Sequence, residues 1–135
     1  MSLENVEIVR RFNERWLLGD WPGLADLVDP RIEQHGAVGG IEEGRLLCGL
    51  DEIRRDWEAV ERQWDEHRVE PQKFIDAGDR VVILLRESQR GMRSGIELSV
   101  DTAVVADVRN GRIVRIQGYM DQADALRAVG LEERG

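Results

Sequence analysis

The hydrophobic period of the chain changes once, near residue 66, and this change limits the folds open to it. Before that point apolar residues recur every three or four positions, as in helices; after it they recur every second position, as in strands. The spacing predicts helices over 4–18, 22–28 and 51–65, a short strand over 31–35, and a glycine-rich loop over 36–49. Helices followed by a run of strands predict an α+β domain, with N-terminal helices packed on a curved antiparallel sheet.

Turn residues divide the second half into strands. The predicted strands cover 67–75, 80–90, 96–108 and 112–120, and the segments between them are DAGD at 76–79, GMRSG at 91–95 and Asn110-Gly111. A last short helix follows over 122–129, with Gly130 just past its end. The 135 residues are predicted to form one domain, 1–135, long enough to bury its own core.

Charge and cysteine content exclude several classes of function. A net charge of −8 disfavours binding to nucleic acid and to anionic membranes. Cys48 is the single cysteine, and the two histidines, His35 and His67, lie far apart, so we expect no metal site and no cofactor. No apolar run is long enough for a signal peptide or a membrane span, which predicts a cytoplasmic protein.

Alternation along the last two strands predicts which side chains face the helices. In the strand over 96–108 the even-numbered residues are nearly all apolar, and we expect them to face the helices; they include Thr102 and Val104. The even-numbered residues of 112–120 follow the same pattern. A three-residue loop over 109–111, with a bulge at Gly111, keeps even residues opposite even residues. A two-residue Asn110-Gly111 loop would instead move Asp101 or Tyr119 into the pocket.

In the strand over 80–90, both the even-numbered and the odd-numbered residues include several apolar side chains. If GMRSG is a five-residue loop, Arg90 pairs with Ile96, the even residues face inward, and Arg86 points into the fold. The odd residues would then form an apolar patch on the outer face, extended by Ala103, Val105 and Ile113. Because water tolerates a contiguous apolar patch poorly, we predict a homodimer in which a second copy covers this outer sheet face.

Four segments, in this order and spacing, resemble the SnoaL-like branch of the NTF2-like superfamily. They are ENVEIVRRF…GDW, LVDPRIE, VEPQKFIDAGDRVVILLR and NGRIVRIQGYMDQADALRAVGL, and they span nearly the whole chain. The resemblance implies an α+β cone, dimerisation by the sheet face, and a mostly apolar pocket for a small apolar molecule. Members include ketosteroid isomerases, polyketide cyclases, epoxide hydrolases and dehydratases, so the fold alone does not determine the activity.

Some residues depart from what this resemblance implies for catalysis. Phe12 stands where the isomerases carry a tyrosine that donates to the oxyanion. Many SnoaL-like relatives carry a histidine at about the position of Val104, and this chain has none there. Asp121 matches the carboxylate that ends the family's last strand, but its place before QADALRAV also fits a helix N-cap. The phenylalanine at position 12 weakens the isomerase interpretation, and the missing histidine near position 104 weakens the cyclase interpretation.

The predicted pocket has an apolar wall and a small polar group. Its predicted lining residues are Phe12, Trp16, Gln34, Arg86, Thr102, Val104 and Met120. A buried guanidinium needs a partner. For Arg86 this would be a protein carboxylate such as Glu70, or a carboxylate of the ligand.

Two side chains are weak candidates for general acid–base catalysis. A histidine is well suited to proton transfer near pH 7, but placing Ile32 in the core puts Gln34 inside and His35 outside, unless a bulge at Gly36 turns His35 inward. Asp101 would have a raised pKa in an apolar pocket, and the alternative is an outward residue beside Ser99. Cys48 has no nearby histidine in the sequence and is not expected to be a nucleophile.

Two hypotheses for the function remain open. The first is an enzyme of isomerase or cyclase type that acts by acid–base chemistry on a small, mostly apolar molecule. The second is a non-catalytic module that binds an apolar ligand, with Arg86 pairing a ligand carboxylate.

Overall fold

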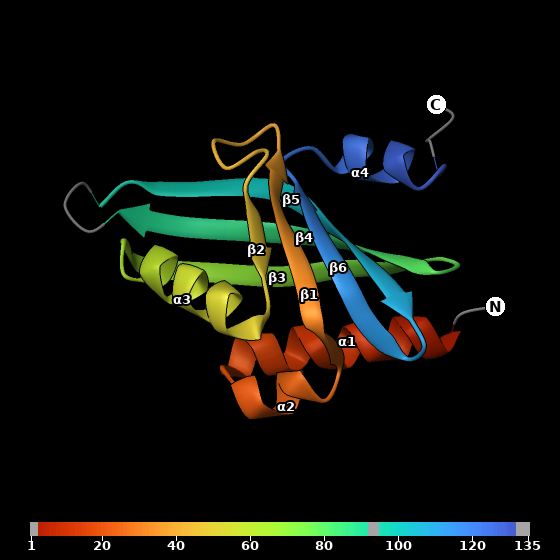
Figure 1. The fold of residues 1–135 in the computed structure, drawn as a ribbon. Coiled ribbons are helices and arrows are strands. Elements are labelled where there is room, and N and C mark those ends of the chain that lie inside the picture. Colours follow the sequence, from red (N-terminus) through yellow and green to blue (C-terminus); the bar gives the residue numbers. More distant parts are fainter. Residues whose placement is uncertain (1–2, 92–94, 132–135) are drawn as a thin grey trace.

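A computed structural model describes residues 3–91 and 95–131 of the chain. The helices are α1 (Leu3–Leu18), α2 (Trp21–Ala25), α3 (Leu50–Glu61) and α4 (Gln122–Ala128), and the strands are β1 (Val28–Val38), β2 (Leu46–Cys48), β3 (Trp64–Ala77), β4 (Arg80–Gly91), β5 (Glu97–Arg109) and β6 (Arg112–Tyr119). The six strands form one curved, open sheet in the order β2-β1-β6-β5-β4-β3 (Figure 1). Only the β1–β6 pair is parallel. The predicted α+β class, with N-terminal helices on a curved sheet, is confirmed.

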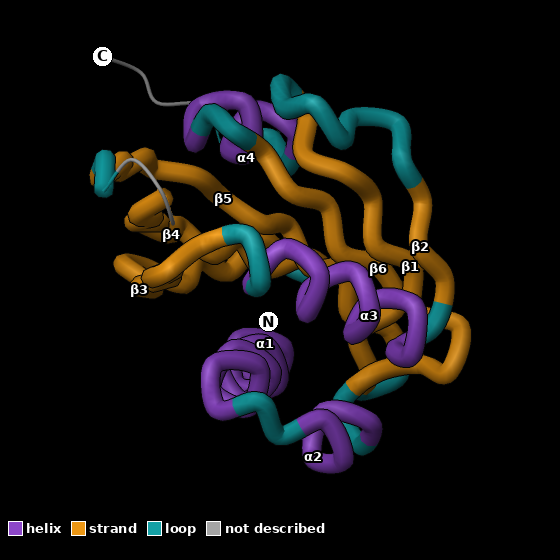
Figure 2. Tube along the Cα trace, turned by 90° about the vertical axis from the view of Figure 1, so that its left-hand side faces the viewer, coloured by secondary structure: helices purple, strands orange, loops and turns teal. Residues whose placement is uncertain are grey.

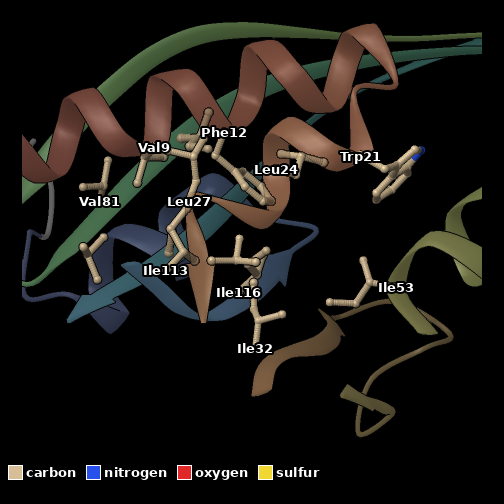
Figure 3. Packing of buried hydrophobic residues seen from close by; sticks show 14 of the residues in the cluster. Val9, Phe12, Trp21, Leu24, Leu27, Ile32, Ile53, Val81, Ile113 and Ile116 are labelled. Atoms are coloured by element: carbon tan, nitrogen blue, oxygen red, sulfur yellow. The ribbon is translucent and has the colours of Figure 1, made fainter. Parts of the chain in front are cut away.

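The core lies between the first three helices and one face of the sheet. In Figure 2, α1, α2 and α3 lie on one side of the sheet and α4 on the other. Figure 3 shows side chains of α1 and α2 meeting Ile32, Ile113 and Ile116 of the sheet. Burying each such side chain contributes about 2 kcal/mol to folding, so this layer holds the helices in place.

Element bounds differ from the predictions at several places. The predicted helix over 22–28 ends at Ala25, and Val28 already belongs to β1. The first strand runs over Val28–Val38 rather than 31–35, and part of the predicted loop over 36–49 forms the short edge strand β2. The predicted helix over 51–65 ends at Glu61, and Trp64 opens β3 opposite Gly91. Trp64 continues the helical stripe in the sequence, but the chain has already turned into the sheet when it reaches this residue.

The β5–β6 turn is a two-residue loop, so the predicted three-residue loop is wrong. Arg109 pairs with Arg112, and Asn110 and Gly111 have φ angles of 51° and 76°, the left-handed pair of a type I′ turn. A bulge still occurs, but one step further along, where Asp107 pairs with Arg115 and Val108 with Ile113. It restores the pairing of even with even residues, and Asp101 and Tyr119 stay out of the inner core.

The β4–β5 register differs by one residue from the prediction. Arg90 pairs with Glu97 rather than Ile96, although residues 92–94 of the predicted GMRSG loop lie outside the described residues. Because a one-residue slip exchanges the two faces of a strand, the odd residues of β4 face the helices. Val81, Ile83 and Leu85 belong to the main core, whereas Val82 lies on the outer face.

The outer apolar face is covered by the chain itself. Val82, Ala103 and Val105 are buried with Ala125 of α4. Ile113, predicted on the outer face, lies in the main core, since the bulge in β6 turns it inward. Coverage by α4 removes the physical reason for a second copy at these residues, and the homodimer stays a prediction.

Candidate functional site

A cavity of about 210 Å³ opens between α1, α3 and the inner face of the sheet. For comparison, an apolar cavity of about 150 Å³ can hold benzene. The lining side chains come from seven elements and are mostly apolar: Phe12, Asn13, Trp16, Gln34, Trp57, Val69, Ile83, Leu85, Glu87, Val104 and Ile116. The composition and size suit a small organic molecule.

Aromatic rings form one wall of the cavity. The Trp16 ring lies 5.6 Å from that of Phe12 and 5.0 Å from that of Trp57, measured between centroids, and the two indoles meet edge to face. Phe12 and Trp16 are four residues apart on α1, which places them on one face of the helix. Trp57 comes from α3, so the wall forms only when the two helices pack together.

Glu87 is the one ionisable side chain among the described residues that line this cavity. Two side chains fix its carboxylate. Oε1 lies 3.2 Å from Nε2 of His67, and Oε2 accepts a 2.7 Å hydrogen bond from the Thr102 hydroxyl. The other ring nitrogen of His67 lies 2.5 Å from a carboxylate oxygen of Glu61, at the end of α3. His67 is almost completely buried, with 2% of its side chain exposed.

The network favours the charged forms of both central groups. The hydrogen bond to Glu87, aided by the contact with Glu61, raises the pKa of His67 even though burial acts in the opposite direction. The hydrogen bond from His67, with a second from Thr102, lowers the pKa of Glu87 against its own burial. Both ring nitrogens of His67 thus lie beside a carboxylate, an arrangement that favours the protonated imidazole, and of the two carboxylates only Glu87 reaches the cavity.

Two amide side chains supply further polar atoms. Asn13 of α1 is buried and Gln34 of β1 is half-buried, and both line the cavity. Neither side chain hydrogen-bonds to another group within residues 3–91 and 95–131. Each amide can donate and accept, so both can bond to a molecule in the cavity.

A second cavity of about 190 Å³ adjoins the first and shares Gln34, Val104 and Ile116 with it. On its other side Arg45 forms ion pairs with Asp56, at 2.7 Å, and with Glu42, at 3.1 Å. The segment that carries Arg45 returns over β1, where the amide of Gly36 donates to the Arg45 carbonyl.

Four of the seven predicted pocket residues line the main cavity: Phe12, Trp16, Gln34 and Val104. Thr102 lies on the same face and bonds to Glu87. Met120 is 40% exposed and packs near Gly39 and Gly40, outside the main cavity.

Arg86 does not point into the fold. The β4 register turns its side chain to the outer face, where it is exposed and donates from Nε to Asp101 at 2.9 Å. The pKa of Arg86 is raised by this hydrogen bond and that of Asp101 lowered, so neither group is set up to exchange protons near neutral pH. Arg86 and Asp101 thus pair with one another on the opposite side of the sheet from the cavity.

The remaining candidates lie outside the main cavity. His35 is absent from its lining but lines the adjoining cavity of about 190 Å³, where its ring nitrogen lies 2.9 Å from a carboxylate oxygen of Glu33. Asp121 caps α4, accepting from the amide of Ala123 at 2.8 Å. Cys48 is exposed.

Sequence reasoning missed Glu87, His67 and Asn13. The correct parity of β4 would have found Glu87, because it follows Ile83 and Leu85 on the same face. His67 carries a weaker signal: it lies two residues before Val69 and so on the same side of β3, and Val69 faces the cavity. Within the described part of the chain, no group of three metal-binding side chains has an arrangement suited to a metal ion.

The fold and the site together define a class of protein: an α+β domain whose helices and curved sheet enclose a small, mostly apolar cavity. The sequence profile of the SnoaL-like domain family matches residues 9–116, and the chain belongs to this family. The comparison with curated proteins found no match. None of the helices within residues 3–91 and 95–131 is both long and apolar enough to cross a membrane.

Solved structures share the fold over nearly the whole chain. An NTF2-like protein from Burkholderia thailandensis E264 is 25% identical, with a TM-score of 0.77 over 98% of this chain and 100% of that one. An NTF2-like protein of unknown function from Burkholderia pseudomallei K96243 is also 25% identical, with a TM-score of 0.74 over 96% and 99% of the two chains. A protein from Jannaschia sp. CCS1, described as a candidate SnoaL-like polyketide cyclase, is 16% identical with a TM-score of 0.73 over 96% and 94%, which shows the fold alone.

Proposed function

We propose that this domain binds a small, mostly apolar molecule in the main cavity and orients it through Glu87, Asn13 and Gln34. The observation that carries the proposal is a carboxylate, held by His67 and Thr102, in the wall of an otherwise apolar cavity. Small-molecule sites commonly combine an apolar lining with a few placed polar groups. The carboxylate accepts a hydrogen bond from the ligand, and the two free amides bond to its other polar atoms.

Binding fits the site better than general-base catalysis does. A proton taken up by Glu87 would leave a neutral carboxyl beside the His67 imidazolium and weaken their hydrogen bond. The loss of this hydrogen bond on protonation is the main reason why the pKa of Glu87 is lowered. A carboxylate with a lowered pKa is a weak base near neutral pH. The same lowered pKa keeps Glu87 ionised and able to anchor a donor.

Acid–base chemistry of isomerase or cyclase type is the second candidate, favoured by a titratable group inside an apolar cavity. In such a step Glu87 would take a proton from a carbon next to a carbonyl, and an Asn13 or Gln34 amide would donate to the enolate oxygen. The protonated Glu87 would then return the proton to another carbon of the same molecule. Substitution Glu87→Gln separates the two functions, because it would abolish turnover while an amide can still hold a neutral ligand.

The prediction of a carboxylate-bearing ligand depended on Arg86 lying inside the pocket, and this condition is not met. Arg86 is paired with Asp101 on the outer face, and no basic side chain is among the described residues that line the main cavity. The homodimer rests on the family resemblance alone, because α4 covers the patch that suggested it.

Binding can be measured through the tryptophans that line the cavity. The probe is 4-methylphenol, which is small, mostly apolar and carries one hydrogen-bond donor for Glu87. We expect a saturable change in tryptophan emission, since Trp16 and Trp57 both line the cavity. Val104→Phe should fill the cavity and weaken binding at least about tenfold, in line with the few kcal/mol that overfilling a packed site costs.

The control for that experiment is Leu98→Phe, which makes a similar change at an exposed position of the same strand. It should leave the affinity unchanged. Equal binding by the wild type and by Val104→Phe would place the probe elsewhere and contradict the proposal.

A further inference from the structure

The charge of the site is not balanced. Glu61 and Glu87 are two carboxylates around one histidine, so the cluster keeps at least one negative charge even when His67 is protonated. The side chain of Glu87 is 24% exposed and that of Glu61 is 36% exposed. Within the described residues, Glu87 is the only charged side chain on the cavity wall, and His67 is shielded from the cavity behind it. The two arginines that flank Glu87 along β4 pair with other carboxylates, Arg86 with Asp101 and Arg90 with Glu66.

The rest of the wall also favours a positive charge. Phe12, Trp16 and Trp57 line the same cavity as Glu87, and the faces of aromatic rings attract cations. Trp57 already packs against the His67 ring, with 5.4 Å between the ring centroids. A cation beside Glu87 would meet the carboxylate on one side and aromatic rings on others.

An anionic ligand meets the opposite situation. In the main cavity it would face the Glu87 carboxylate without a basic partner among the described lining residues. Arg45 lies in the adjoining cavity, but two carboxylates, Asp56 and Glu42, already hold its guanidinium. Bringing an anion beside the partly buried carboxylate of Glu87 is unfavourable, and no basic side chain among the described residues of this cavity wall offsets the cost.

We propose that the ligand of this cavity is a small protonated amine on a mostly apolar body, with its ammonium group bound by Glu87 against the aromatic wall. This inference rests on the proposed binding function and specifies the class of ligand. A charge-assisted hydrogen bond is stronger than a neutral one, so the charge should add affinity beyond burial of the apolar body.

Three probes of nearly equal size test the charge: 2-phenylethylamine, 2-phenylethanol and phenylacetate. We expect the amine to bind at least about tenfold more tightly than the alcohol, and phenylacetate to bind most weakly. Glu87→Gln should remove the preference for the amine and leave the affinity for the alcohol within a few-fold. Asp101→Asn, which neutralises a carboxylate on the outer face, is the matched control and should keep the preference.

The outcomes separate this inference from the proposed function. If amine and alcohol bind equally, and Val104→Phe weakens both, the cavity binds small molecules but has no preference for a cation, and the inference is overturned. Tighter binding of phenylacetate overturns it as well. If none of the three probes binds, both proposals are contradicted. Should Glu87→Gln fail to fold, the order of the three affinities in the wild type still decides the matter.

Discussion

At the scale of single residues, the central observation is that His67 joins a helix to the sheet. Its two ring nitrogens contact Glu61, at the end of α3, and Glu87, in the middle of β4. The imidazole is nearly excluded from water, and removing it would leave two carboxylates without their shared partner. We therefore expect His67 to contribute to stability and to hold Glu87 in place.

This contribution should depend on pH in a defined direction. The pKa of His67 is raised above its ordinary value of 6.5, so its stabilisation is complete below pH 6.5 and is lost as pH rises through the folded-state pKa. The pKa of Glu87 is lowered from 4.5, so its contribution is present above pH 4.5 and is lost as pH falls through its folded-state pKa. Urea unfolding at pH 5.5 should show His67→Gln less stable than the wild type by about 2 kcal/mol, with a smaller difference above the raised pKa.

His35→Gln is the matched control, because His35 is the other histidine and bonds to one exposed carboxylate, that of Glu33. Its effect on the free energy of unfolding should be smaller than that of His67→Gln at pH 5.5. A difference between wild type and His67→Gln that stays constant or grows with rising pH would contradict the assignment of His67 as a buried imidazolium.

At the scale of elements, the segment between β1 and β2 depends on one close approach of backbones. A Cβ atom added at Gly36 would lie 1.7 Å from the carbonyl oxygen of Glu42, and the amide of Gly36 donates to the Arg45 carbonyl. The segment can lie against β1 only if residue 36 has no side chain. This contact in turn places Arg45 and Glu42 at the second cavity.

Gly36→Ala should therefore displace this segment. We expect a loss of about 2 kcal/mol in the free energy of unfolding, which is typical of forced overpacking, together with a changed environment at Arg45. Gly118→Ala provides the comparison, since its added Cβ would lie 3.3 Å from the side chain of Ala37, a contact that a small shift can relieve. Equal stability of the two variants in urea unfolding would show that the segment adapts without cost.

At the scale of the whole molecule, α4 completes the layering. It lies on the face opposite α1, α2 and α3 (Figure 2). Its residue Ala125 is buried in one cluster with Val82, Ala103 and Val105. The side-chain amide of Gln122, at the start of α4, also donates a hydrogen bond to the carbonyl of Thr102, whose hydroxyl in turn donates to Glu87. The outer helix therefore supports the strand that carries part of the site.

A charge at the centre of this contact should unfold or strongly destabilise the domain. We expect Ala125→Asp to lower the free energy of unfolding by about 3 kcal/mol, because it buries a carboxylate among apolar side chains. Ala123→Asp, on an exposed position of the same helix, should cost far less. If the two variants are equally stable, α4 does not pack on the outer face as described.

The sequence by itself determined the fold class, the order of the elements apart from the short strand β2, and the part of the aromatic wall that α1 supplies. These features depend on local signals: the change of hydrophobic period, the turn residues, and the four-residue spacing that places Phe12 and Trp16 together. Side-chain alternation along β5 also placed Val104 correctly on the inner face.

Only the tertiary structure decided which charged residues reach the cavity. A one-residue difference in the β4–β5 register moved Arg86 outside and Glu87 inside, and a bulge in β6 turned Ile113 into the core. Because β4 is apolar on both faces, no pattern within the strand distinguishes the two registers. The partnership of Glu87 with His67 and Glu61 depends on contacts among β4, β3 and α3, which only packing brings together.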